Sequence, residues 1–253
     1  MPNILITGAA SGLGKAFVTA YIKDTDNSVL AVDRGFSSFP AQDVLDAADA
    51  YRKNVGNDET NTLRMFTADV RDERQITTQL HDVRDIDLVI HSAGVRGLER
   101  SVSMVKSEDV AKAETLAVMT AETMTDTFHI NAVGTFLLIR ALLPKLRPGG
   151  GSKVVIMGSR MGSMGSNTTG GGYAYRASKA ALNAVVKSFS IDAPDVVFAI
   201  VHPGRVESGL VAIKEEGAIS AEESVGDLLG LIGKLGKDSS GRFLDRFGGD
   251  VPW

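Results

Sequence analysis

The chain contains a tyrosine and a lysine, Tyr175 and Lys179, whose types and spacing suit proton transfer. Four residues are about one turn of a helix, so a helix brings the phenol and the ammonium to one face. A free tyrosine has a pKa of about 10 and is a poor acid or base at neutral pH. A nearby cation favours the phenolate and lowers that pKa towards the working range. Such pairs are common on helix surfaces, so the interpretation depends on the rest of the chain.

A glycine-rich turn near the N-terminus is the second candidate site. The apolar stretch 3–7 leads into Thr7-Gly8-Ala9-Ala10-Ser11-Gly12-Leu13-Gly14, and a helical pattern follows. The glycines permit a sharp turn, close approach of the backbone to a pyrophosphate and close packing of helix on strand, and the helix N-terminus offers N–H groups to the phosphates. The turn lacks the Lys-Ser/Thr ending of a nucleoside-triphosphate loop, which argues against ATP or GTP hydrolysis. A purely structural turn is the alternative.

Two acidic residues follow the second and third apolar runs. Asp33 has the position of a carboxylate that accepts hydrogen bonds from an adenosine ribose and repels a 2′-phosphate. Ser11 adds no positive charge, so NAD(H) is favoured over NADP(H), although Arg34 is able to meet a phosphate and leaves NADP(H) open. Asp69 suits either a hydrogen bond to the adenine amino group or the cap of a helix that begins near Arg71.

The elements that must position these residues alternate along the chain. Short runs rich in Ile, Val and Leu, with little alternation of polarity, are typical of parallel strands covered on both faces. Amphipathic stretches separate them, and this order predicts a doubly wound α/β sheet of about seven parallel strands. No shift of composition marks a boundary, so residues 1–253 are expected to form one Rossmann-type domain. The predicted strands are 3–7, 29–33, 63–66, 86–91, 153–157, 196–201 and 242–244, and the predicted helices are 13–23, 41–53, 71–83, 123–146, 173–190 and 221–235.

Composition narrows the class of protein. The 253 residues include no cysteine, which excludes a disulfide framework, a thiolate metal site and a cysteine nucleophile. The net charge of −4 argues against a nucleic acid or an anionic membrane as partner. Even the apolar run 136–143 is interrupted by Arg140 and falls short of the roughly 18 residues of a membrane span. No signal peptide is recognised, and a cytoplasmic protein is expected.

Further motifs connect the two candidate sites. In order along the chain stand Thr7-Gly8-x-x-x-Gly12-x-Gly14, Asp33, Asp69-Val70, Ala93-Gly94, Asn131, Ser159, Tyr175-x-x-x-Lys179 and Pro203-Gly204. Together they resemble the short-chain dehydrogenase/reductase family in its single-domain form, over nearly the whole chain. The segment 158–163, the run Tyr-Arg-Ala-Ser-Lys and the ending Asp-Val-Pro-Trp resemble its C-factor and carbonyl-reductase-like subgroup. The resemblance implies an oxidoreductase that moves a hydride between NAD(P) and the carbonyl or alcohol carbon of a small substrate.

The resemblance also implies roles for single residues. Tyr175 would be the general acid/base on the substrate oxygen, and Lys179 would lower the pKa of Tyr175 and hold the nicotinamide ribose. Asn131 would hold a water that links Lys179 to solvent, or else mark a helix kink filled by its side chain. No metal ligand is expected. Cofactor contacts are implied for Gly8, Ser11, Gly12, Leu13, Gly14, Asp33, Asp69, Val70, Ala93, Gly94, Tyr175, Lys179, Pro203, Gly204, Val206 and Ser208.

The loop after the fifth predicted strand and the end of the fourth depart from the family pattern. Ser159 would hydrogen-bond the substrate oxygen, although Ser163 and Ser166 crowd the same loop. Gly158 stands where the family usually has a first serine, which is expected to loosen the loop. His91 replaces the first asparagine of the usual Asn-Asn-Ala-Gly, so its ring nitrogens must connect the central strands or leave groups to water.

The expected enzyme has one rival from another class, a dinucleotide-binding sensor or signalling protein with little catalysis. The presence of all the expected catalytic residues argues against that rival. The segment 205–220 is expected to form a lid whose apolar members Leu210, Val211 and Ile213 favour a hydrophobic substrate. Tyr173 is expected to be a substrate-wall or packing residue. The family's pairing of long helices implies a homodimer or homotetramer, which the small residues between 177 and 184 would permit.

Overall fold

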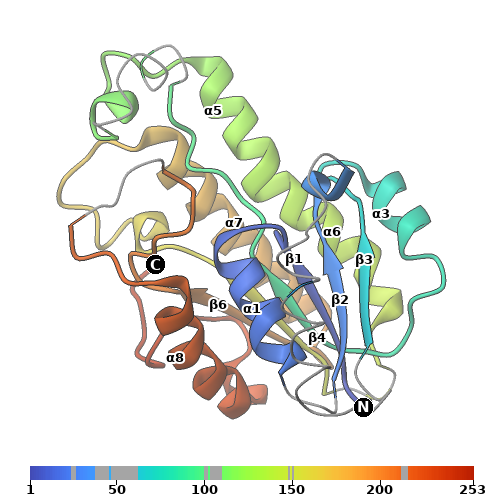
Figure 1. Ribbon diagram of the computed structural model, residues 1–253. Helices are drawn as coiled ribbons and strands as arrows, with labels where there is room; N and C mark the ends of the chain where they lie inside the picture. Colours follow the sequence, from blue (N-terminus) through green and yellow to red (C-terminus); the bar gives the residue numbers. More distant parts are fainter. Residues whose placement is uncertain are drawn as a thin grey trace.

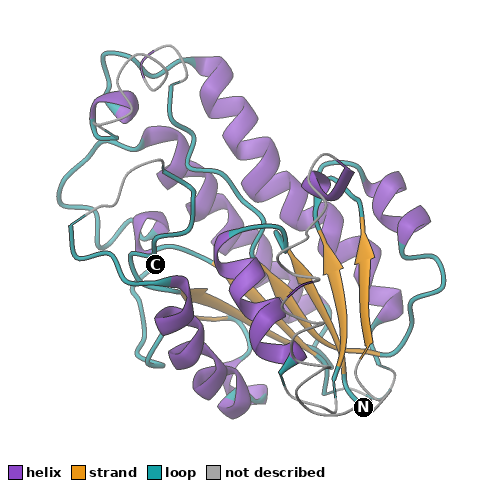
Figure 2. Cartoon of the chain, in the orientation of Figure 1, coloured by secondary structure: helices purple, strands orange, loops and turns teal. Residues whose placement is uncertain are grey.

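The centre of the computed structural model is one sheet of seven parallel strands in the order β3-β2-β1-β4-β5-β6-β7, drawn in orange in Figure 2. The strands are β1 (Asn3–Thr7), β2 (Ser28–Val32), β3 (Thr62–Phe66), β4 (Ile86–His91), β5 (Lys153–Met157), β6 (Val197–His202) and β7 (Arg242–Asp245). Each predicted strand differs from these bounds by at most one residue at either end, and the predicted doubly wound fold is confirmed.

The structure describes residues 1–23, 27–37, 46, 62–99, 102, 110–147, 149, 151–211 and 216–253. The predicted helix 41–53 therefore lies outside the described residues, apart from Asp46.

Helices cover both faces of the sheet (Figure 1). On one face lie α1 (Gly12–Ile22) and α8 (Ala221–Lys234), and on the other lie α3 (Glu73–Gln79), α6 (Gly134–Leu142) and α7 (Tyr173–Asp192). Successive residues of a strand point to opposite faces, so Ile4 and Ile6 of β1 join the cluster of α1 and α8, whereas Leu5 joins that of α6 and α7. Burial on both sides is why the strand sequences show no alternation of polarity.

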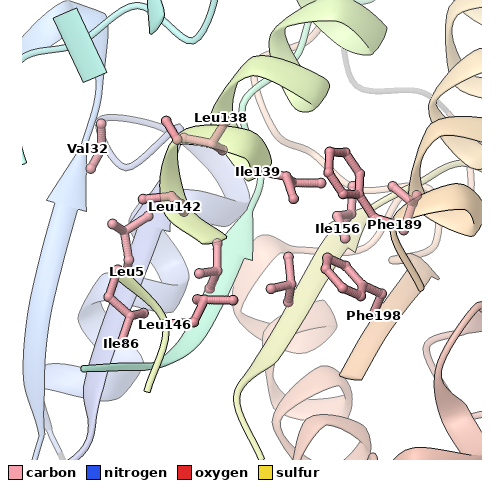
Figure 3. Packing of buried hydrophobic residues seen from close by; sticks show 14 of the residues in the cluster. Leu5, Val32, Ile86, Leu138, Ile139, Leu142, Leu146, Ile156, Phe189 and Phe198 are labelled. Atoms are coloured by element: carbon pink, nitrogen blue, oxygen red, sulfur yellow. The ribbon is translucent and has the colours of Figure 1, made fainter. Parts of the chain in front are cut away.

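The cluster of α6 and α7 is the layer that fixes the helices of the site on the sheet (Figure 3). Leu138, Ile139 and Leu142 of α6 are at most 2% exposed. Phe189 of α7 stacks on Phe198 of β6, with 6.0 Å between the ring centroids. Burial of a large apolar side chain stabilises a fold by about 1.5–3 kcal/mol relative to exposure, so this layer holds α6 and α7 firmly in place.

The predicted helix 123–146 is interrupted in the structure. After α5 (Ala121–Phe128) the chain makes a π-helical turn, η3 (His129–Val133), before α6 and a last 3-10 turn, η4 (Leu143–Lys145). Single π turns inside helices are frequent at functional sites. By length and composition alone the run Ala121–Lys145 is able to cross a membrane, but 50% of its most apolar part is buried, as in the core helix of a globular protein.

The order of the strands reverses at β1, which lies between β2 and β4. In open parallel sheets, ligands bind beyond the carboxyl ends of the strands at such a reversal. The segments that leave β1, β4, β5 and β6 at this edge begin with Gly8, Ser92, Gly158 and Pro203. The fold therefore brings motifs far apart in the sequence to one edge of the sheet.

Candidate active site

Two adjoining cavities lie along the carboxyl edge of the sheet. The first, of about 230 Å³, is lined by every residue expected to contact the cofactor except Gly14, Gly204 and Val206. The second, of about 470 Å³, is lined by Ser159 and by Gly204 and Val206. The residues that line both cavities are Leu13, Gly158, Tyr175, Pro203, Ser208 and Leu210. The two cavities therefore adjoin each other at Tyr175.

The glycine-rich turn lies so close to neighbouring backbone that side chains would not fit at its glycines. Gly12 adopts a φ of +49°, and a Cβ there would lie 2.3 Å from the carbonyl oxygen of Ser208. Gly14 does not reach the cavity; a Cβ on it would lie 2.1 Å from the carbonyl oxygen of Gly8, so its role is the close packing of α1 on the turn. Ser11, the N-cap of α1, makes no side-chain cap hydrogen bond. An N-terminus of this kind offers its N–H groups to phosphate, so these residues fit a dinucleotide.

Asp33 braces the glycine-rich turn against the end of β2. One carboxylate oxygen accepts from the N–H of Ala10 (3.1 Å) and the other from the N–H of Gly35 (2.7 Å). Asp33 and Arg34 both line the first cavity. The Arg34 side chain is 61% exposed, and its guanidinium lies 4.0 Å from the carboxylate of Asp69. The structure thus places both a carboxylate and a cation on the lining of the first cavity.

Asp69 lines the first cavity and does not cap a helix. Helix α3 begins at Glu73, and its N-cap is Asp72, whose carboxylate accepts from the N–H of Gln75 at 2.9 Å. The capping alternative for Asp69 is therefore wrong. Its carboxylate instead accepts from the backbone N–H and the guanidinium of Arg71, and the hydrogen bond from that guanidinium is the main reason why the pKa of Asp69 is lowered.

Tyr175 and Lys179 lie on one face of α7, as their spacing predicts. The Lys179 ammonium nitrogen is 5.8 Å from the centroid of the Tyr175 ring and donates a hydrogen bond to the carbonyl of Met157 at the end of β5 (2.8 Å). Burial lowers the pKa of Lys179 from 10.5 to about 8. Tyr173, two residues before Tyr175, is 38% exposed and lines neither cavity.

Asn131 lies in the π-helical turn and connects three segments. Its side-chain amide donates to the carbonyl of Val95 (2.8 Å) and to the hydroxyl of Ser178 on α7 (3.0 Å), and its amide oxygen accepts from the N–H of Val95 (2.9 Å). The side chain therefore bonds across to other elements rather than filling a kink in its own helix. A Cβ on Gly94 would lie 3.1 Å from the Asn131 amide oxygen and 3.7 Å from the Lys179 nitrogen, so these two groups face the same small space.

His91 joins β1, β4 and α6 through one directed chain of hydrogen bonds. Thr135 Oγ1 donates to the carbonyl of Asn131 (2.7 Å), so its oxygen accepts from His91 Nε2 (2.9 Å). His91 Nδ1 then accepts from Thr7 Oγ1 (2.7 Å), whose oxygen faces the N–H of Ala93 at 3.4 Å. Because each hydroxyl has one proton, the chain assigns the neutral tautomer protonated at Nε2. Both ring nitrogens of His91 therefore form hydrogen bonds to neighbouring elements. This is one of the two outcomes expected for a histidine in place of the family's asparagine.

Replacing His91 by asparagine should make the folded state less sensitive to acid. Burial, followed by the Lys179 ammonium, lowers the pKa of His91 from 6.5 to about 3. The unfolded chain therefore takes up a proton that the folded chain does not, and stability falls as the pH drops from 6.5 towards 3. One such group changes the free energy of unfolding by up to about 1.4 kcal/mol per pH unit. Asparagine does not titrate, so the H91N variant lacks this contribution.

Urea unfolding at a series of pH values between about 4 and 7 measures how the free energy of unfolding depends on pH in each protein. The exposed His81 provides the matched control, because His81→Asn removes an imidazole and should keep the slope of the unaltered protein. An H91N variant with that same slope would contradict the assignment of a buried neutral ring.

The loop after β5 presents Ser159 to the second cavity. Its hydroxyl oxygen accepts from the N–H of Met161 (3.2 Å) and starts the 3-10 turn η5 (Arg160–Gly162). Ser163 is 1% exposed and lines neither cavity, whereas Ser166 also lines the second. The expected loosening at Gly158 is wrong, because a Cβ there would lie 2.5 Å from Ile200 Cγ2. Glycine is required at this position by packing.

The segment after β6 lies beside both cavities. Of the apolar residues in the expected lid, Leu210 lines both cavities and Val211 lines the second. An isolated bridge between Val206 and Ile219 holds the two ends of the segment together. Residues 212–215, which include Ile213, lie outside the described residues.

Sequence reasoning missed an ion pair next to Tyr175. The guanidinium of Arg96 lies 5.0 Å from the centroid of the Tyr175 ring and makes two hydrogen bonds of 2.9 Å to the carboxylate of Glu114. The Glu114 carbonyl accepts from the N–H of Gly172, directly before α7 (2.9 Å). No motif marks these residues, and the only available signal was the position of Arg96 shortly after Ala93-Gly94.

The chain is similar to known proteins over most of its length. Residues 2–218 match the family described as short chain dehydrogenase. The C-signal of Myxococcus xanthus is 39% identical over 170 residues, which make up 66% of this chain and 93% of that protein. A carbonyl reductase from Pseudomonas aeruginosa PAO1 in complex with NADP is 27% identical and superposes over 100% of both chains with a TM-score of 0.73. The NADPH-bound carbonyl reductase from chicken fatty liver, 24% identical, shares the fold over 100% of this chain and 99% of its own, with a TM-score of 0.81.

The family match spans most of the chain and includes the glycine-rich turn and the Tyr175–Lys179 helix. The similar proteins are a C-signal and carbonyl reductases. The chain therefore belongs to the short-chain dehydrogenase/reductase family, in its C-factor and carbonyl-reductase-like branch, and is an NAD(P)-dependent oxidoreductase that acts on CH–OH and C=O groups.

Proposed function

We propose that the protein interconverts a ketone and a secondary alcohol, or an aldehyde and a primary alcohol, with Tyr175 as the general acid/base. One observation carries the proposal: Tyr175 lines both cavities, and Lys179 lies one helical turn further along the same face. A residue in this place borders the space for a cofactor and the space for a substrate. Proton transfer at the substrate oxygen requires that position.

The chain's own residues divide the work at the reacting oxygen. Tyr175 gives its phenolic proton to the carbonyl oxygen in reduction and takes it back in oxidation. The Lys179 ammonium favours the phenolate that forms. The Ser159 oxygen accepts from the N–H of Met161, which leaves its hydroxyl proton for the substrate oxygen, where a fixed dipole stabilises developing charge.

Asn131 acts as a positioning residue in this scheme and supports the supply of protons. Both of its amide hydrogens are used, one by Val95 and one by Ser178. A water that links Lys179 to solvent would therefore donate to the Asn131 amide oxygen or main-chain carbonyl. The closeness of that amide oxygen and the Lys179 nitrogen to Gly94 supports this arrangement.

The cofactor, when bound, supplies the hydride chemistry. In the proposed arrangement the glycine-rich turn holds the pyrophosphate, Asp33 the adenosine ribose, Lys179 the nicotinamide ribose and the backbone of Val206 the carboxamide. We propose NAD(H) as the preferred form, because the Asp33 carboxylate would repel a 2′-phosphate. The NADP-bound relative and the adjacent Arg34 are the reasons to test this preference directly.

Replacing Asp33 by alanine should lower kcat/KM for NAD(H) about tenfold, the effect of losing one good hydrogen bond, and affect NADP(H) much less. Because Asp33 also braces Ala10 and Gly35, an Asp33→Asn variant is measured beside it: asparagine has nearly the same shape, keeps one of the two acceptor oxygens and removes the charge. Steady-state rates with both cofactors give the ratio. Equal losses for NAD(H) and NADP(H) in both variants would show that Asp33 does not select the cofactor.

The experiment that tests the proposed function is a screen of NADH and NADPH against ketones and aldehydes, and of the oxidised cofactors against secondary and primary alcohols. We expect cofactor consumption with several carbonyl compounds that is lost in a Tyr175→Phe variant. Cofactor binding without turnover of any compound would favour the sensor alternative.

We further propose a homodimer or homotetramer in the cytoplasm. The outer faces of α5, α6 and α7 leave Met124, Phe128, Phe136, Ala177 and Ala184 exposed, and apolar and small residues of this kind suit close packing of helices between copies. Light scattering on the purified protein measures the assembly, and a monomer mass would contradict it.

A further inference from the structure

The second cavity is lined by Ser159 and Tyr175 and is rich in arginine. Five arginines line it, and Asp245 is the single carboxylate residue among the described lining residues. The arginines come from five separate segments: Arg96 after β4, Arg160 in η5, Arg176 in α7, Arg205 after β6 and Arg246 after β7. An excess of positive charge around a cavity raises the local concentration of anions.

The partners of these arginines show which charges are available. Arg96 is paired with Glu114, and Arg246 with Glu223 and Asp227. In the described part of the chain, Arg176 donates to the carbonyls of Gly171 and Met161 and to the Thr169 hydroxyl, and Arg205 to the carbonyl of Glu216. Neither of these two guanidinium groups is paired with a carboxylate there.

Arg160 stands apart from the other four. Within the described residues its guanidinium forms no hydrogen bond or ion pair, and the side chain is exposed at the cavity wall, directly after Ser159. An arginine without a carboxylate partner, beside a residue expected to touch the reacting oxygen, is suited to hold a second group of the same substrate. Its planar fork matches a carboxylate in two parallel hydrogen bonds.

His202, at the end of β6, also lines the second cavity. Burial, followed by Arg160, lowers the pKa of His202 to about 4; Arg246 acts in the same direction and Asp245 in the opposite one. His202 Nδ1 is buried and has no hydrogen-bond partner in the described structure. The ring is therefore uncharged at neutral pH, and the positive charge near it comes from Arg160 and Arg246.

We propose that the second cavity binds a carboxylate of the substrate, with Arg160 as its main contact, so that the enzyme acts on aldehydes or ketones with an apolar body and a carboxylate. This proposal rests on the proposed function. Met161, Leu210, Val211 and Phe247 line the same cavity and would contact the apolar body. Asp245 lines the same cavity and would oppose a doubly charged group such as a phosphate monoester more strongly than a carboxylate. The sequence favoured a hydrophobic substrate, and this proposal adds a carboxylate at one end of it.

The test compares 4-acetylbenzoate with its uncharged methyl ester, which share the same ketone. Turnover with reduced cofactor gives kcat/KM for each compound, and calorimetric titration in the presence of oxidised cofactor gives the affinity of each without any reaction. The variants are Arg160→Gln and Arg64→Gln. Arg64, on β3 outside both cavities, is a surface arginine paired with Asp82, and its loss removes the same charge from the protein.

The unaltered protein should prefer the acid to the ester in both measurements. In R160Q the ratio of acid to ester should fall about tenfold, the low end for hydrogen bonds to a charged group, whereas R64Q should keep it. The preference should also weaken as salt is added. A ratio that is the same in R160Q and in the unaltered protein, or a preference for the ester, would overturn the carboxylate site, and so would tighter binding of 4-acetylphenyl phosphate than of 4-acetylbenzoate.

The two measurements separate the proposals. If neither ketone is turned over but the acid binds more tightly than the ester and loses that advantage in R160Q, the carboxylate site stands and the proposed reaction fails. If both are turned over equally well and R160Q changes neither ratio, the reaction stands and the carboxylate site fails.

Discussion

Replacing Tyr175 by phenylalanine should lower kcat/KM by about 10²- to 10⁴-fold, the usual contribution of a general acid or base, and leave cofactor affinity within about twofold of its original value. The ring of Tyr175 is 6% exposed and contacts Arg96 through its face. Phenylalanine keeps that ring and its packing, so the variant should fold normally. What it lacks is the phenolic proton that the proposed mechanism gives to the substrate oxygen.

The neighbouring tyrosine provides the control. Tyr173 lies in the first turn of the same helix, is 38% exposed and lines neither cavity. Tyr173→Phe removes the same hydroxyl and should keep full turnover. Steady-state kinetics and titration of reduced cofactor by fluorescence measure both quantities. A Y175F variant with more than about a tenth of the original kcat/KM would remove Tyr175 from the mechanism.

The parts of the site that could be predicted from the sequence are those with local causes. The glycine-rich turn joins β1 directly to α1, and backbone conformation and close packing demand glycine there. The relation of Tyr175 to Lys179 follows from one turn of helix. Strands covered on both faces have an apolar pattern that can be read from single runs, which is why β1, β4 and β5 have the predicted bounds.

The remaining features depend on contacts between distant segments. The need for glycine at position 158 comes from Ile200 on the next strand, and the cap of α3 comes from Asp72 because Arg71 holds the carboxylate of Asp69. The π-helical turn around Asn131 has no local signal such as proline. These features arise only when the fold is complete, so periodicity and motif spacing do not contain them.

The arginines of the second cavity illustrate the same limit. They come from five segments of the chain, and no spacing links them. The apolar residues of the lid were visible as a local run and suggested a hydrophobic substrate. Whether that apolar surface faces a charged wall is decided by the neighbours that the sheet order brings to it.

The buried ammonium of Lys179 should lower the free energy of unfolding. Lys179 as a whole is 5% exposed. Its ammonium donates a hydrogen bond to the Met157 carbonyl and has no carboxylate partner among the residues described. Burial of a charge without a counter-ion costs free energy, and this cost is why the pKa of Lys179 falls from 10.5 to about 8. Residues kept for function often carry such a cost.

Lys179→Met should therefore lower kcat/KM by about 10²-fold or more and raise the free energy of unfolding at neutral pH by about 1–3 kcal/mol. The lost hydrogen bond to Met157 will offset part of that gain. The pH dependence is the sharper measurement. Between pH 8 and 10.5 the unfolded chain binds a proton at Lys179 that the folded chain has released, so the stability of the unaltered protein rises with pH by up to about 1.4 kcal/mol per unit.

In K179M this contribution to the rise should be absent, because methionine does not titrate. Lys187→Met is the matched control, since Lys187 lies on an exposed stretch of the same helix. Urea unfolding of the three proteins across this pH range gives the slopes. A K179M variant with the slope of the unaltered protein would show that the ammonium is not desolvated in the fold. The proposed effect of Lys179 on the tyrosine would then have to act through solvent, where a charge 5.8 Å away has far less influence than it has in a buried site.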